Sequence, residues 1–205
     1  MSSAPQLPRL YAIIDADTLA AVDLQGFAAE LVSGGATLIQ YRSKNATSRE
    51  ILSTAREMRR NAPRARLVMN DRADLCLAAG FDGVHLGQDD LSVASARTIV
   101  GPQCWIGASA HNPEQVREAD RSPVDYVAIG PVFGTQSKKN PDPVLGVEGV
   151  RAARVLTRKP LVAIGGITRA NCRDVIQAGA DSVAVISDLA DSPRQSVKDF
   201  LRILE

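Results

Sequence analysis

Short apolar runs alternate with helix-forming segments along the whole chain of 205 residues. Eight such runs recur at intervals of roughly 25 residues, a spacing typical of strand–helix units. They lie at 10–14, 36–41, 66–69, 83–86, 105–108, 126–129, 161–164 and 182–185. Because the runs consist almost purely of Val, Ile, Leu and Ala, they resemble parallel strands that are buried on both faces. The alternation therefore predicts an α/β fold built on a parallel sheet.

Residues with strong conformational preferences mark the ends of the expected helices. Thr18 is expected to cap a first helix that ends at Gly34-Gly35, and Thr47 or Ser48 to cap the second. Later helices are expected at 73–79, 92–100, 148–157, 169–178 and 193–201, with one more opened by Asn112-Pro113-Glu114 and a long loop at 130–146.

Eight strand–helix units predict a single-domain (β/α)8 TIM barrel over residues 9–205, preceded by a polar N-terminal tail at 1–8. A doubly wound open sheet is the main alternative, because it is also a run of strand–helix units. The first strand is not followed by a GxGxxG motif, which weakens a dinucleotide-binding interpretation.

Composition narrows the class of protein. A net charge of +1, from 24 basic and 23 acidic side chains, argues against a nucleic-acid partner. The three cysteines, an odd count without CxxC spacing, are expected to be buried or free thiols in a reducing compartment. No apolar run has membrane-spanning length and no signal-peptide core is present, so we expect a cytoplasmic protein.

Catalytic groups of a barrel collect at the carboxyl ends of its strands. Gln40, Arg42 and Lys44 end the second strand at a spacing of two, so they project to one side of an extended chain. Arg and Lys at this spacing suit a phosphate-rich anion. A solvated, salt-bridged strand end is an equally good interpretation of these three residues taken alone.

Two carboxylates, Asp71 and Asp90, follow the third and fourth strands. Carboxylates from neighbouring strands suit Mg²⁺, which takes one or two protein carboxylates together with phosphates and water. For either residue alone, a helix cap or a surface charge is the better interpretation. The sequence has no HExxH motif, Cys/His cluster or EF-hand spacing, which argues against zinc and calcium.

A second anion site is predicted after the last strands. Gly165-Gly166 and Ser187 each precede an expected helix, as in the phosphate sites of many barrels, although a glycine pair also makes a tight turn. The segment Thr135-Gln136-Ser137-Lys138 could cover a bound phosphate or form a disordered basic loop. Of the two histidines, His85 is expected in or near the core and His111 to be better placed for function. Two anion sites on one rim suit an enzyme that joins or rearranges two phosphorylated compounds.

Seven motifs, in order and spanning residues 10–189, resemble the thiamine-phosphate synthase family. They are Gln40-x-Arg42-x-Lys44, Asn70-Asp71-Arg72, Gly83-Val84-His85-Leu86-Gly87-Gln88-x-Asp90, Ile106-Gly107-x-Ser109-x-His111, Gly130-Pro131-Val132-Phe133-x-Thr135-x-Ser137-Lys138, Ala163-Ile164-Gly165-Gly166-Ile167 and Val185-Ile186-Ser187. The resemblance implies a (β/α)8 barrel that couples 4-amino-2-methyl-5-hydroxymethylpyrimidine diphosphate to a (carboxy)thiazole phosphate with Mg²⁺. The products would be thiamine phosphate and pyrophosphate, and the partners would be these small molecules.

The same resemblance implies roles for individual residues. Asp71 and Asp90 would bind Mg²⁺, and Arg42, Lys44 and Lys138 would be catalytic. The pyrimidine diphosphate would be bound by Gln40, Tyr41, Arg42, Ser43, Lys44, Asn70, Ser109 and Lys138, and the thiazole phosphate by Thr135, Gln136, Ser137, Gly166, Ile186 and Ser187. The family's reaction is thought to be dissociative, with pyrophosphate leaving before the thiazole nitrogen attacks. No general base is needed in that scheme.

The chain departs from the family in one loop, where Pro-Thr-x-Thr-Lys is common and this chain has Gly134-Thr135-Gln136-Ser137-Lys138. We expect the change to be tolerated, and Gly134→Pro with a measured Michaelis constant tests whether it weakens thiazole-phosphate binding. The alternatives are a thiazole tautomerase-like isomerase and a non-catalytic binding protein for thiazole phosphate or thiamine phosphate. Neither needs the Mg²⁺ and diphosphate residues. The sequence leaves the oligomeric state open, a homo-oligomer included.

Overall fold

The computed structural model describes residues 6–19, 23–135 and 142–205. Within these residues, eight parallel strands pair in chain order and β1 closes the barrel by pairing with β8. The strands are β1 Leu10–Asp15, β2 Leu38–Arg42, β3 Arg66–Asn70, β4 Gly83–Leu86, β5 Trp105–Ala110, β6 Tyr126–Ile129, β7 Leu161–Ile164 and β8 Ser182–Val185. The predicted barrel is confirmed, and the open sheet is excluded by the β1–β8 pairing.

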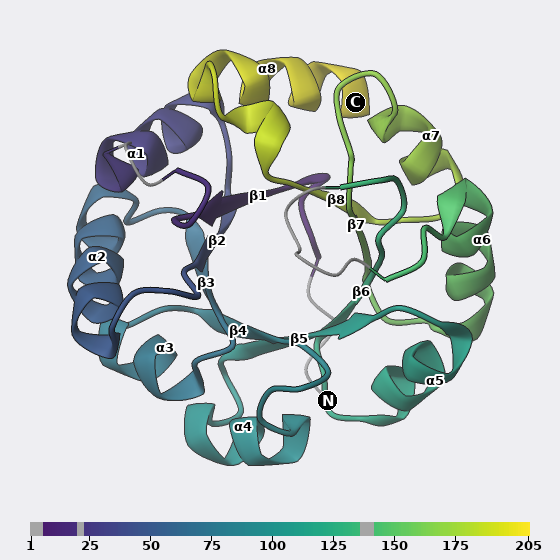
Figure 1. Ribbon diagram of the computed structural model, residues 1–205, viewed down its shortest axis with the longest axis horizontal. Coiled ribbons are helices and arrows are strands. Elements are labelled where there is room, and N and C mark those ends of the chain that lie inside the picture. The colour runs from purple at the N-terminus through teal and green to yellow at the C-terminus, as the bar shows by residue number, and fades with distance from the viewer. Residues whose placement is uncertain (1–5, 20–22, 136–141) are drawn as a thin grey trace.

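Helices surround the barrel, one after each strand (Figure 1). They are α1 Leu24–Gly34, α2 Ser48–Asn61, α3 Ala73–Ala79, α4 Val93–Val100, α5 Pro113–Arg121, α6 Gly146–Leu156, α7 Cys172–Gln177 and α8 Pro193–Leu204, with a short 3-10 helix η1 at Ser187–Leu189. Thr47 caps α2 through a capping box with Glu50, as the sequence predicts.

The predicted start of the first helix is wrong. Helix α1 begins at Leu24 and is capped by Asp23, whose carboxylate accepts a hydrogen bond from the backbone N–H of Gln25. Thr18 instead donates its hydroxyl to the carbonyl of Asp15, in the turn after β1. Thr and Asp are both good caps, so local sequence does not choose between them.

Side chains alternate between two buried layers. One apolar cluster fills the space between the strands and the helices, and a smaller one fills the inside of the barrel. The inner cluster comprises Tyr11, Ile13, Leu38, Val68, Tyr126, Ala128, Val162 and Ala184, with Leu7, Trp105, Ile164 and Ile186 packed against it. On β2 the alternation places Gln40 and Arg42 inside the barrel, while Tyr41 joins the outer cluster.

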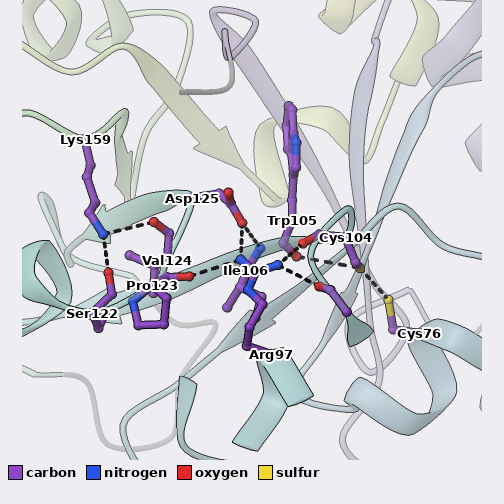
Figure 2. A network of polar contacts seen from close by, with 11 residues as sticks. Cys76, Arg97, Cys104, Trp105, Ile106, Ser122, Pro123, Val124, Asp125 and Lys159 are labelled. Atoms are coloured by element: carbon purple, nitrogen blue, oxygen red, sulfur yellow. Dashed lines mark hydrogen bonds and ion pairs between the residues drawn. The ribbon is translucent and has the colours of Figure 1, made fainter. Parts of the chain in front are cut away.

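Polar contacts fasten the connections at the amino-terminal end of the barrel (Figure 2). The guanidinium of Arg97 donates to the carboxylate of Asp125 at 2.6 Å and to the carbonyl of Cys104, and Asp125 also accepts from the backbone N–H of Ile106 at 2.7 Å. The sulfur atoms of Cys76 and Cys104 lie 3.6 Å apart and both residues are free thiols, as the sequence predicts. Contacts at this end serve stability, because barrels carry their active sites at the opposite end.

Candidate active site

The carboxyl ends of β1 and β2 hold an ion pair between a buried carboxylate and a partly buried guanidinium. Arg42 donates through Nη1 to Oδ2 of Asp15 at 2.7 Å, and its guanidinium lies 3.7 Å from a carboxylate oxygen of Asp17. Asp15 is only 1% exposed and holds the Arg42 side chain, which is 20% exposed, from the buried side. Asp17 also accepts the backbone N–H of Lys44 at 2.9 Å. Sequence reasoning noted Asp15 at the end of the first strand but did not include it or Asp17 in the site.

A cluster of three charged groups lies at the ends of β2, β3 and β4. The ammonium of Lys44 contacts a carboxylate oxygen of Asp71, and Asp71 shares a hydrogen bond with Asp90. Burial and the neighbouring Asp90 raise the pKa of Asp71 to about 6, with Lys44 acting in the opposite direction. Burial also disfavours ionised Asp90, but hydrogen bonds from Asp71 and from the backbone N–H of Gly87 outweigh it and lower the pKa of Asp90. The two carboxylates predicted from separate loops are therefore one pair.

The backbone at Asp71 is unusual. Its φ of 62° is the only positive value at a non-glycine position among the described residues. A left-handed conformation at such a residue costs about 1 kcal/mol or more and is often found at functional sites. A hydrogen bond from the N–H of Asp71 to the carbonyl of His85, 2.7 Å long, holds this turn in place.

The Asp71–Asp90 pair fits a divalent cation. Two carboxylates this close concentrate negative charge, as the raised pKa of Asp71 reflects, and a cation would neutralise it. No group of three or more His, Cys, Asp or Glu suited to a metal occurs in the part of the chain that the structure describes. Two protein carboxylates nevertheless match the Mg²⁺ preference for few protein ligands, completed by phosphate oxygens and water.

The loops after β6 and β7 pack tightly together on the same rim. Phe133 donates its N–H to the carbonyl of Gly165 at 2.9 Å. Gly166 has a φ of 62°, and a Cβ there would lie 2.5 Å from the carbonyl oxygen of Gly134, so only glycine fits. Thr135 lies half-buried in the first of these loops, whereas Gln136, Ser137 and Lys138 fall outside the described residues.

Two more of the predicted thiazole-phosphate residues follow β8. Ile186 precedes the 3-10 helix η1, and the exposed Ser187 begins it. The structure thus brings the described members of the second predicted cluster, namely Thr135, Gly166, Ile186 and Ser187, to the ends of β6, β7 and β8.

A buried hydrogen-bonded chain links the remaining predicted residues. Gln40 donates to the hydroxyl of Tyr11 at 2.8 Å, and the hydroxyls of Tyr11 and Tyr126 lie 3.0 Å apart. His85 bridges Tyr126 and Ser109, with Nδ1 3.1 Å from the Tyr126 hydroxyl and Nε2 2.9 Å from Ser109 Oγ. Burial lowers the pKa of His85 to about 4, so its ring is neutral at pH 7.

Sequence reasoning missed the two tyrosines and treated His85 as a core residue. His85 is indeed buried, but it contacts Ser109, a predicted pyrimidine-diphosphate residue.

His111 instead lies against the loop after β6, where Nδ1 contacts the carbonyl of Gly130 at 2.6 Å. Tyr41 lies in the apolar cluster between the strands and the helices, and burial raises its pKa. Asn70 ends β3 and is half-buried beside these groups.

A cavity of about 460 Å³ opens at the other end of the barrel, lined in part by Arg59, Arg66, Asp82 and Trp105. Three of its charged side chains are already engaged: Arg59 pairs with Asp82, and the guanidinium of Arg66 stacks 3.7 Å from the centre of the Trp105 ring. We place the active site at the carboxyl ends of the strands, where the unusual backbone and the paired carboxylates lie.

None of the helices over the described ranges is long and apolar enough to cross a membrane.

Comparisons with known proteins identify the family of this chain. The family model for thiamine monophosphate synthase matches residues 10–189. A thiamine-phosphate synthase of Koribacter versatilis is 60% identical over 209 residues, covering 100% of this chain and 99% of the relative, and one of Chloroflexus aurantiacus is 42% identical, covering 87% and 83%. The solved structure of a thiamine phosphate pyrophosphorylase from Pyrococcus furiosus superposes with a TM-score of 0.86 at 34% identity, over 96% of this chain and 95% of that one. The chain therefore belongs to the thiamine monophosphate synthase family.

Proposed function

We propose that the chain joins 4-amino-2-methyl-5-hydroxymethylpyrimidine diphosphate to a thiazole phosphate, forming thiamine phosphate and releasing pyrophosphate. Membership of the family and 60% identity over the whole chain make it a thiamine-phosphate synthase, whereas the metal and the residue roles are inferred from the site. The observation that carries the inference is the Asp71–Asp90 pair with Lys44 on it and Arg42 on the neighbouring strand. It combines a cation site with two basic groups suited to a diphosphate.

The bond changes define what the site has to do. The carbon–oxygen bond between the pyrimidine methylene and the diphosphate breaks, and the oxygen keeps the electron pair. The thiazole nitrogen then supplies its own electron pair to form the new carbon–nitrogen bond. Because no proton moves in either change, no general base is required. The site has to stabilise negative charge on the departing pyrophosphate and align the two substrates.

Arg42 and Lys44 would stabilise the negative charge that develops on the departing pyrophosphate. Asp15 and Asp17 hold Arg42 in place, so its guanidinium need not reorganise when charge develops on the leaving group. Lys44, now paired with Asp71, would turn to the diphosphate when a cation occupies the carboxylates. Lys138, a catalytic residue by resemblance, would add a third positive charge from the loop after β6.

Asp71 and Asp90 would hold Mg²⁺. When bound, this ion supplies positive charge that neutralises diphosphate oxygens. The pyrimidine ring would lie over Gln40 and Ser109, with Asn70 beside it, and the 40–44 segment would follow the diphosphate. Thr135, Gln136, Ser137, Gly166, Ile186 and Ser187 would hold the phosphate of the thiazole. We further infer a cytoplasmic enzyme whose partners are these small molecules.

Pyrophosphate release tests the proposal. Purified protein is given both substrates, each substrate alone, and both substrates with a chelator in place of Mg²⁺. We expect release only with both substrates and Mg²⁺. Absence of release by folded protein would contradict the proposed reaction and favour an isomerase or a binding protein. Pyrophosphate release that persists in the chelator would show that the reaction does not need Mg²⁺.

A further inference from the structure

Polar side chains fill a layer of the barrel that aliphatic residues ordinarily fill. Tyr11 and Tyr126 are 1% and 0% exposed, and His85 is buried with them. The hydroxyls and both ring nitrogens all have partners within the chain of contacts from Gln40 to Ser109. A buried polar network is stable only while each member keeps its partner, so it constrains the groups at its two ends. Those ends are two of the predicted pyrimidine-diphosphate residues.

The hydrogen bonds of this chain can run in only one direction at a time. Nε2 of Gln40 is a donor, so the Tyr11 oxygen accepts from it. Either hydroxyl can donate across the Tyr11–Tyr126 contact, and donation by Tyr11 is the direction that gives the hydrogens of both tyrosines an acceptor. Tyr126 then donates to Nδ1 of His85, which leaves the proton of the neutral ring on Nε2. Nε2–H in turn donates to Ser109 Oγ.

The direction decides what each end offers to a ligand. The bond from Nε2 to Tyr11 uses one of the two amide hydrogens and fixes the flip of the Gln40 amide, so its carbonyl oxygen Oε1 is presented as an acceptor on the side away from Tyr11. Ser109 Oγ already accepts from His85, so its own hydrogen is left as a donor. A 4-aminopyrimidine carries the complementary pair, an amino group that donates and a ring nitrogen that accepts. A 4-oxopyrimidine carries the reverse pair.

We propose that Tyr11, Tyr126 and His85 are positioning residues that fix the donor and acceptor pattern of Gln40 and Ser109, and so select an amino- over an oxopyrimidine diphosphate. The selection of substrate rests on the proposed function. The direction of the hydrogen bonds can be measured without substrate.

The surrounding structure is shaped to hold this chain. Gly107 on β5 is the register partner of Tyr126 on the neighbouring strand β6, and a Cβ at Gly107 would lie 2.1 Å from Cζ of the Tyr126 ring. The Tyr126 ring is also stacked on His85 with centroids 5.6 Å apart, and it meets Tyr11 edge-on at 6.0 Å. The hydroxyl of Tyr126 is therefore held between its two partners by packing on three sides.

The first experiment measures the tautomer of His85 in the full chain without ligand. The chain has two histidines, so ¹⁵N spectra of the imidazole rings at pH 7.5 are assigned by comparison with His85→Gln. We expect a protonated Nε2 and an unprotonated Nδ1. The opposite tautomer would reverse the chain and overturn the proposal.

The second experiment measures selection with Tyr126→Phe, which removes one hydroxyl from the middle of the chain. We expect KM for the aminopyrimidine diphosphate to rise about tenfold, the value of one buried hydrogen bond, with KM for thiazole phosphate unchanged. The preference in kcat/KM for the amino over the 4-oxo analogue should fall by a similar factor, because His85 can then adopt either tautomer. Val68→Ala, which removes two methyl groups from the same inner cluster, is the control and should leave that preference unchanged.

The outcomes separate the two proposals. Wild-type turnover with an unchanged amino/oxo preference in Tyr126→Phe would overturn the positioning role and leave the proposed function standing. If Val68→Ala lost the amino/oxo preference to the same extent, the loss would be due to general packing. That result would also overturn the positioning role. Failure of the wild type to turn over either pyrimidine would overturn the proposed function and the substrate selection together, whatever the tautomer.

Discussion

Gly107→Ala should destabilise the barrel although it adds only one methyl group. Gly107 lies on β5, and the added Cβ would lie 2.1 Å from Cζ of Tyr126 and 2.4 Å from its Cε2 and hydroxyl oxygen. Carbon atoms in contact prefer about 3.5 Å or more, so the ring has to move by roughly 1.5 Å. Its stacking on His85 and its contact with Tyr11 oppose that movement.

The size of the effect follows from three contributions. Overpacking of a core costs about 1–3 kcal/mol. Displacement of the Tyr126 hydroxyl weakens its hydrogen bonds to Tyr11 and His85, each worth about 1 kcal/mol. Replacement of glycine by alanine offsets about 0.4–1 kcal/mol of this loss, because it lowers the conformational entropy of the unfolded chain. We expect a net loss of about 2–3 kcal/mol in the free energy of unfolding, and a Tm lower by about 4–12 °C for a chain of this size.

Urea denaturation followed by circular dichroism measures this loss. Gly134→Ala is the matched control, because nothing lies within 4 Å of its added Cβ, and it should change stability by less than about 0.5 kcal/mol. Gly107→Ala is also measured in a Tyr126→Leu background, where the ring is absent and the cost should shrink. A wild-type midpoint for Gly107→Ala, or an equal cost in both backgrounds, would refute the steric reasoning.

Other predictions concern the rim and the buried histidine. Asp71→Ala and Lys138→Ala should each lose most pyrophosphate release while keeping the circular dichroism of the wild type, and normal turnover would remove that residue from the mechanism. Asp15→Asn should raise KM for the pyrimidine diphosphate and cost about 1–3 kcal/mol of stability, because Arg42 loses a buried charged partner; unchanged KM and stability would show that Arg42 does not need it. The pKa of His85 is about 4 in the folded chain and about 6.5 when exposed, so the unfolded state binds the extra proton between these values. Stability should therefore fall as the pH drops from 6.5 toward 4, by about 2 kcal/mol at pH 5 from this group. His85→Gln should lose that part of the pH dependence in urea denaturation at pH 7.5 and 5, and an identical slope would contradict the buried neutral ring.

Much of the fold could be predicted because the signals are local. Apolar runs such as that of β7, stopped by Gly165-Gly166, mark a buried strand and its end within a few residues. The start of α1 could not be predicted in the same way. Thr18 and Asp23 both have a side chain that can cap a helix, and the turn after β1 uses Thr18 for another hydrogen bond.

The charged part of the candidate site was also predictable in outline. Gln40, Arg42 and Lys44 follow the period of two of a strand, and parallel strands place their carboxyl ends on one rim, so Asp71 and Asp90 had to come near them. The sequence does not show that Asp71 adopts a positive φ, nor that Asp15 holds Arg42. Both depend on hydrogen bonds between residues on different strands.

By itself the sequence determined the order of strands and helices, the rim on which the polar residues gather and the family resemblance. Only the tertiary structure decided the buried chain from Gln40 to Ser109. Tyr11 and Tyr126 are 115 residues apart, and each reads as an ordinary apolar position in its own strand. They become one network because closure of the barrel turns the inner faces of distant strands toward each other. Hydrogen bonding depends on that proximity in space, which no local pattern encodes.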